Sequence, residues 1–121
     1  MKPPVFTILS ASAAVRAQLG ASPCRVYPFG RAPEGVADPY CVWQVQGGAP
    51  EIYIGTRPDI DQWIVQFDVY GTSADSVEAA GMAIRDAIEI RYPVTAWLGT
   101  TRDPGTKRYR LTFMSSWWVN R

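Results

Sequence analysis

Residues 61–91 read DQWIVQFDVYGTSADSVEAAGMAIRDAIEIR, and this stretch decides the fold. Its first part alternates between apolar and polar side chains, with Ile64 and Tyr70 as exceptions. The apolar face carries Trp63, Val65, Phe67 and Val69. An alternation with a period of two is typical of a strand that is buried on one face. Gly71 ends the pattern, so the stretch predicts a strand and then a tight break.

A helix is predicted directly after this strand. Thr72 or Ser73 can cap its N terminus, and Asp75 places negative charge in its first turn. Apolar or small residues then recur at spacings of three and four, which makes one stripe along the helix. The stripe consists of Val77, Ala80, Gly81, Ile84 and Ile88. A glycine inside a helix costs roughly 1 kcal/mol relative to alanine, so Gly81 predicts a close approach of the helix to the sheet.

The rest of the chain supplies further strands and a shorter helical segment. Residues 3–19 predict one helix or two short ones, and residues 24–29 and 40–46 predict strands, the second broken by Gly47-Gly48. Residues 94–98 and 107–119 predict strands on either side of a turn at residues 103–105. We therefore predict an α+β (mixed α/β) fold in one domain, residues 1–121. Its mixed or antiparallel sheet has about four to six strands, and the N-terminal helix and the long central helix pack on one face.

Residues 47–61 predict a projecting β-arm or long loop. The segment contains exposed apolar residues that would suit a monomer's loop poorly, and long structured arms usually contact another molecule. Its candidate contact residues are Glu51, Ile52, Tyr53, Ile54, Arg57, Asp59 and Asp61.

Composition excludes several classes of protein. The net charge is +1, so no overall field favours nucleic acid or a membrane, and no apolar run approaches the length of a membrane span. Histidine, the commonest general base and metal ligand, is absent. The basic residues are ten Arg and two Lys, which suits planar contacts with carboxylates at interfaces or simply reflects a GC-rich genome. Cys24 and Cys41 form no metal or redox motif, and we expect two buried thiols rather than a disulfide.

A search for reactive groups finds little. Asp59 and Asp61 form an Asp-x-Asp that could bind a divalent cation, but no third acid stands nearby, and a solvated turn is the simpler interpretation. Gly47-Gly48 is not followed by a helix start, so it is no phosphate loop. We expect no enzyme, no cofactor and no metal site.

Two surface features suggest contacts of another kind. The run 102–110 carries Arg102, Lys107, Arg108 and Arg110 with an aromatic residue between them, which could bind nucleic acid or form a solvated hairpin. Trp118 points away from the apolar face of the last strand and is a candidate for a protein interface or for packing under the N-terminal helix.

The charges are also divided along the chain. Residues 34–68 hold six acids and one base, whereas residues 102–121 hold five bases and one acid. Such a division could supply complementary patches between neighbouring subunits, with Arg108 and Arg110 opposite the acids of the arm. Two alternatives stay open: the charges pair within one subunit, or the arginines line a lumen through which DNA passes.

Several local phrases resemble a known family. They are Arg25-Val-Tyr-Pro28, Ala32-Pro33, Asp38-Pro39-Tyr40, Val42-Trp43-Gln44, Val65-Gln-Phe-Asp-Val-Tyr70 before an Ala-rich helix, and Tyr109-Arg-Leu-Thr-Phe113. With the order of elements, they resemble the tail-completion, or tail-terminator, proteins of long-tailed (siphovirus-like) bacteriophages. The resemblance covers nearly the whole chain and carries no catalytic residues.

The resemblance implies a structural virion protein made in the host cytoplasm and placed at the neck. It implies a homohexameric ring that caps the head-proximal end of the tail tube, stops its growth and joins the tail to the head connector. The partners would be other copies of the chain, the tail tube protein and a connector or head-completion protein, with DNA only as cargo in the lumen. The alternatives are another neck component, such as an adaptor, and a small nucleic-acid-binding module that uses residues 102–110.

Overall fold

The computed structural model describes residues 2–52 and 55–121. Three helices and five strands follow one another in the order α1 (Val5–Ser10), α2 (Ala13–Leu19), β1 (Val26–Pro28), β2 (Tyr40–Pro50), β3 (Ile60–Gly71), α3 (Ala74–Ile88), β4 (Val94–Arg102) and β5 (Tyr109–Asn120). The strands form one sheet in the order β1-β2-β3-β5-β4. The β1–β2 pair is parallel and the other three pairs are antiparallel. The predicted α+β fold with a mixed sheet is confirmed.

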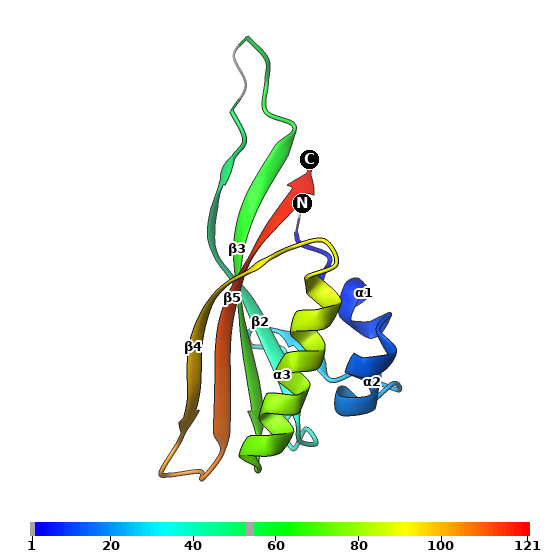
Figure 1. Cartoon of the computed structure of the whole chain (residues 1–121), viewed down its shortest axis with the longest axis vertical. Helices are drawn as coiled ribbons and strands as arrows, with labels where there is room; N and C mark the ends of the chain where they lie inside the picture. Colours follow the sequence, from blue (N-terminus) through cyan, green and yellow to red (C-terminus); the bar gives the residue numbers. More distant parts are fainter. Residues whose placement is uncertain (1, 53–54) are drawn as a thin grey trace.

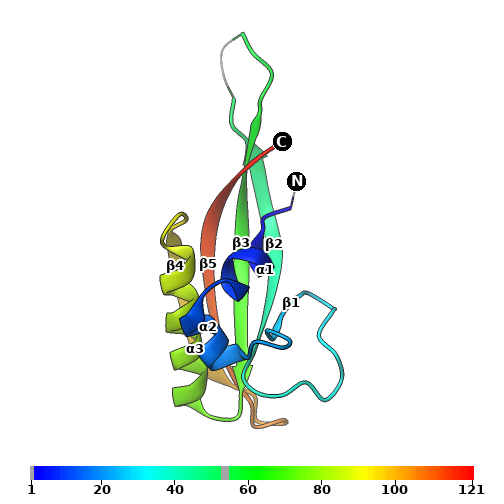
Figure 2. The ribbon, with the colours of Figure 1, turned by 90° about the vertical axis from the view of Figure 1, so that its right-hand side faces the viewer.

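All three helices lie on the same face of the sheet, and the opposite face is bare of helices (Figures 1 and 2). The core lies between these two layers. From the sheet it takes the predicted apolar face of β3, with Phe67 stacked on Phe113 at 5.1 Å between ring centroids. From α3 it takes the predicted stripe, whose members are all buried. The periodicity of residues 61–91 therefore predicts the buried faces of β3 and α3, which belong to the two layers of the domain.

Gly81 stands where α3 crosses β5. A Cβ built on this glycine would lie 2.3 Å from Leu111 Cδ2, a distance that real side chains do not reach without movement. The helix is thus as close to the sheet as the missing side chain allows, which confirms the close approach predicted from the sequence. Ser73 caps α3, since its Oγ accepts a hydrogen bond from the Ser76 N–H at 3.4 Å.

The N-terminal helical segment consists of two short helices. Ser12 separates them and caps α2, with its Oγ accepting from the Val15 N–H at 3.3 Å. Gly20 ends α2 at a φ of 86°, a conformation that favours glycine. Cys24 and Cys41 are both buried and free. Burial raises the pKa of each thiol, because it disfavours the charged thiolate.

The predicted break at Gly47-Gly48 is wrong. β2 continues through these residues to Pro50, with a shift of register between Val45 and Gly47. Gly48 lies so close to β3 that a Cβ would meet the Gln62 carbonyl oxygen at 2.2 Å. The glycines therefore accommodate a bulge and a close strand pair instead of ending the strand.

Candidate assembly interfaces

An arm projects from one end of the molecule, between the end of β2 and the start of β3 (Figure 1). The two strands pair as far as Pro50 opposite Asp61, and the Glu51 N–H then donates to the Ile60 carbonyl at 2.9 Å. Beyond this hydrogen bond the chain leaves the sheet, and Ile52 is 81% exposed. An aliphatic side chain so far from the core has no packing role within the described part of the subunit. It is available to a partner.

The other predicted contact residues of the arm fall into three groups. Arg57 and Asp59 are exposed, whereas Glu51 and Asp61 are partly buried. Tyr53 and Ile54 lie outside the described residues. The structure thus places an exposed apolar residue and two exposed charges together on the arm.

Asp61 and the C-terminal residue hold the base of the arm. The Arg121 guanidinium donates to both carboxylate oxygens of Asp61, at 2.9–3.1 Å, and to the Pro58 carbonyl at 3.2 Å. The Arg121 N–H also donates to the Asp59 carbonyl at 2.8 Å. The hydrogen bonds from Arg121 lower the pKa of Asp61. Asp61 therefore has a partner within its own chain, and no group of metal ligands is found in residues 2–52 and 55–121.

The opposite end of the molecule carries a hollow lined with arginine and tyrosine, at the β4–β5 hairpin. Its volume is about 450 Å³. The lining residues are Tyr40, Tyr70, Thr101, Arg102, Asp103, Thr106, Arg108 and Arg110. The two tyrosine rings stack at 5.2 Å, and burial together with the nearby Asp68 carboxylate raises the pKa of Tyr70. The structure therefore brings three of the four basic residues predicted in this run together around one hollow.

Two of these arginines have carboxylate partners in the same chain. Arg108 forms an ion pair with Asp38, and Arg110 lies 3.8 Å from the Asp68 carboxylate. Arg102 instead lies over the Tyr109 ring, at 5.5 Å from its centroid. The internal ion pairs reduce the positive charge that this end could offer to phosphate groups.

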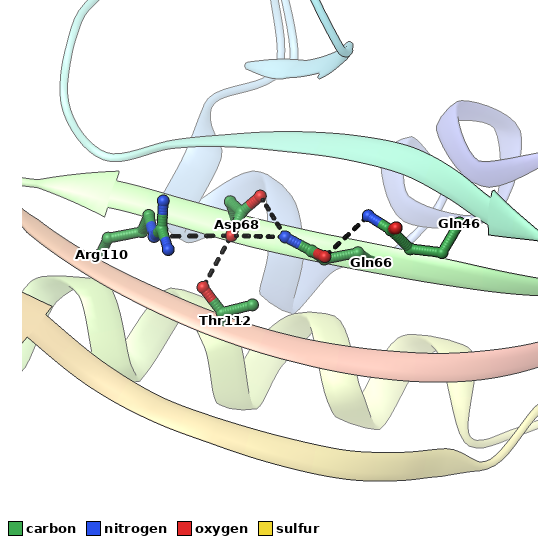
Figure 3. A network of polar contacts seen from close by, with 5 residues as sticks. All are labelled: Gln46, Gln66, Asp68, Arg110 and Thr112. Carbon is green, nitrogen blue, oxygen red and sulfur yellow. Dashed lines mark hydrogen bonds and ion pairs between the residues drawn. The ribbon is translucent and has the colours of Figure 1, made fainter.

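A polar network follows the bare face of the sheet (Figure 3). The Thr112 hydroxyl donates to Asp68 at 2.7 Å, and the Gln66 amide donates to both Asp68 oxygens at 3.1 and 3.3 Å. Gln46 extends the chain of contacts by donating to Gln66 at 2.8 Å. Asp68 is only 5% exposed, although no helix covers this face. Its neighbours on the sheet supply the hydrogen bonds that a buried carboxylate requires.

Trp118 lies on β5 and is 40% exposed. Its carbonyl accepts a hydrogen bond from the Tyr92 hydroxyl at 3.3 Å, and its ring lies 6.4 Å from the Tyr92 ring. The side chain is thus partly covered by its own subunit and partly open, so its role as an interface residue stays a prediction.

The internal ion pairs join the two segments of opposite charge. Asp38, Asp61 and Asp68 of the acidic segment each meet an arginine of the basic segment within one subunit. The pairing within one subunit, left open by the sequence, is therefore present for these residues. Among the described residues, Glu51, Arg57, Asp59, Arg102 and Lys107 take part in none of the ion pairs, and a role between subunits stays a prediction for them.

Sequence reasoning missed the apolar residues at the two edges of the sheet. Phe29 is 69% exposed beside β2, and Trp97 and Leu98 on β4 are 45% and 60% exposed. The strand pattern at 94–98 gave a signal, since it held large apolar residues on both faces. The sequence did not predict which strands lie at the edges of the sheet, because local periodicity carries no information on strand order.

Comparison with known proteins decides the family. The family described as tail completion protein gp17 matches residues 3–120. The chain belongs to this family. It is therefore a structural protein of a phage-like virion, located in the tail or neck region.

Chains of solved structures share the fold, and 18 of them match this chain. One is a chain of the virion of a native gene transfer agent (GTA) particle, with 18% sequence identity and a TM-score of 0.61. The match covers 97% of this chain and 92% of that chain. No curated protein matches. No helix in the described residues is long and apolar enough to span a membrane.

Proposed function

We propose that this tail completion protein forms a homohexameric ring at the head-proximal end of the tail tube. The ring stops polymerisation of the tube and joins the tail to the head connector. The number of copies comes from the resemblance to tail terminators. Heterologous contacts between identical subunits close into a ring when the rotation between them allows it.

The observation that carries the proposal is the difference between the two ends of the subunit. One end bears the arm with its exposed Ile52, and the other bears the hollow around Arg102 and the β4–β5 hairpin (Figure 1). A terminator needs two unlike faces, because the tube protein binds one face and the connector binds the other. If the long axis of each subunit runs along the tail, the arms gather on one face of the ring and the hairpins on the other.

The exposed charges of the two ends suit contacts with such partners. Arg57 and Asp59 lie on the arm, and Arg102 and Lys107 lie at the hairpin. Charges at the rim of an interface contribute orientation and rate of association more than affinity. DNA passes through the ring only as cargo. If the hairpin instead faces the lumen, Arg102 and Lys107 are the exposed basic residues that would contact the passing DNA.

Deletion of the gene tests the proposal. Particles without the protein should carry overlong tails, or tails that are not joined to heads, as seen by negative-stain electron microscopy. Complementation with the wild-type gene should restore both length and attachment. Tails of normal length firmly attached to heads would contradict a terminator.

A further inference from the structure

We infer that neighbouring subunits join through opposite edges of their sheets. In this contact, the outer edge of β4 in one copy lies along the free upper part of β2 in a second copy, and Trp97 enters an apolar hollow there. The inference rests on the proposed ring and specifies which surfaces close it.

The hollow lies where β1 stops. β1 pairs only with Cys41, Val42 and Trp43, so β2 from Gln44 onward has no strand on its outer side within the described residues. We call the adjoining depression the edge hollow, and it combines two neighbouring spaces of about 380 and 230 Å³. The lining residues are Lys2, Pro3, Pro28, Phe29, Trp43, Gln44, Val45 and Trp63.

The edge hollow is apolar and open. Phe29 and Val45 are 69% and 37% exposed, although large apolar side chains gain stability when they are buried. In the part of the chain that the structure describes, backbone groups along the same stretch of β2 have no neighbouring strand on this side. An unpaired strand edge beside exposed apolar side chains is a template for pairing with another chain, and proteins usually protect such an edge.

The other end of the strand order presents a matching surface. β4 is the last strand of the sheet, and within the described residues no strand lies outside it. Trp97 is 45% exposed, yet its ring is held against Phe113 at 4.9 Å between centroids. Leu98 beside it is 60% exposed. A large aromatic residue that is already held in place is a good anchor for a protein interface.

Strand direction agrees with this pairing. Three successive antiparallel pairs lead from β2 through β3 and β5 to β4, so β4 runs opposite to β2. In a ring whose axis follows the strands, each copy keeps the same direction. The new pair of β2 and β4 is therefore antiparallel, like the three pairs before it.

The positions of the edges also predict a tilt. β4 pairs with β5 from Tyr109 to Ser115, whereas the free part of β2 lies across β3 from β5 residues 114–119. The two edges are thus staggered along the strands. Closed sheets accommodate such a stagger by tilting their strands relative to the axis. The register shifts in β4 limit continuous backbone pairing, so the apolar side chains are the main part of the contact.

Chemical cross-linking tests the inference. Gln46→Cys and Thr95→Cys place exposed thiols on the two edges without removing a residue that lines or enters the edge hollow. A short bis-maleimide joins thiols without demanding one register. The native Cys24 and Cys41 are buried, so wild-type protein serves as the unreactive control. At about 1 mM protein, where even weak contacts are populated, the double variant should give a ladder of covalent oligomers. Each single variant should stay monomeric, because an edge never meets a copy of itself.

Matched substitutions in the double-cysteine background locate the contact. Phe29→Ser and Trp97→Ser should each abolish the ladder, and urea unfolding should show that the variants are folded. Ile90→Ser removes an apolar residue that is even more exposed, at 83%, and that belongs to neither edge, so it should leave the ladder intact. Because Phe29 is exposed, its replacement provides a test that does not disturb the core.

The outcomes separate this inference from the proposed ring. No ladder from the double variant, or dimers from either single variant, would overturn the edge-to-edge contact. Rings that still form by electron microscopy would then leave the terminator standing with another side contact. A ladder together with normal attached tails in the deletion mutant would instead keep the contact and remove the proposed function.

Discussion

Replacing Gly81 by alanine tests the closest contact between the helix layer and the sheet. The added methyl group would lie 2.3 Å from Leu111 Cδ2, and Leu111 is 4% exposed. Its side chain must therefore move within a packed core. Alanine improves the helix by roughly 1 kcal/mol over glycine, but overpacking of a core costs about 1–3 kcal/mol. The crowding is the larger effect, so Gly81→Ala should lower the free energy of unfolding by up to about 2 kcal/mol.

The sign should reverse when Leu111 is shortened. Leu111→Ala alone should cost about 2–5 kcal/mol, because it removes a buried side chain and leaves a cavity. In that background the methyl group of Gly81→Ala enters free space, and the higher helix propensity of alanine is no longer opposed by crowding. The second substitution should then stabilise the protein by roughly 1 kcal/mol.

Urea unfolding of the four proteins, followed by tryptophan fluorescence, measures both effects. Equal m-values are required before the free energies are compared. Ala79→Gly, at an exposed position of the same helix, measures the propensity alone and should not couple to Leu111. The reasoning is refuted if Gly81→Ala stabilises the wild-type protein, or if its effect is the same with and without Leu111.

Three further predictions address the core, the arm and the hairpin. Phe67→Ala should cost about 3–5 kcal/mol in urea unfolding because the ring is fully buried, whereas Asp59→Asn should leave folding intact. Asp61→Asn should make the stability of the protein less sensitive to acid. The pKa of Asp61 is lowered in the folded state, so its carboxylate stabilises the fold at pH values above the ordinary carboxyl pKa of 3.8. This stabilisation is lost as the pH falls through the folded-state pKa. Unfolding curves between neutral and strongly acidic pH check this, and an unchanged acid limb would contradict it. Arg102→Glu with Lys107→Glu should reduce incorporation into tails, measured by co-purification, without lowering stability.

The sequence predicted the elements whose patterns are local. The alternation of β3 and the stripe of α3 are strong because one face of each is buried throughout. Gly81 was informative for the same reason, since a glycine in an apolar stripe has no purpose on a solvated helix. The bulge near Gly47 was missed because glycine pairs mark both breaks and bulges, and only the strand opposite distinguishes them.

The candidate interfaces were predicted less completely, because they depend on strand order. Asp68 was predicted on the polar face of its strand. The sequence could not show that Thr112 lies opposite it on β5 and donates a hydrogen bond to its carboxylate. The basic run was predicted from its local spacing, but the partners Asp38 and Asp68 of its arginines are distant in sequence. Phe29 and Leu98 could not be recognised as contact candidates from the sequence, because their exposure depends on which strands lie at the edges of the sheet.

The distribution of charge and apolar surface divides the proposed contacts into two kinds. Antiparallel pairing of β3 with β5 brings acids and arginines of distant segments together, so charges on the body of the sheet meet first within the subunit. Among the charges outside these ion pairs, Arg57 and Asp59 lie on the arm and Arg102 and Lys107 lie at the hairpin, where the tube and the connector would bind. The edges carry apolar side chains instead. Salt screens exposed charges over about 8–10 Å at physiological ionic strength but does not weaken apolar burial. Contacts of the ring with its axial partners should therefore loosen at high salt, while the side-to-side contacts that close the ring persist.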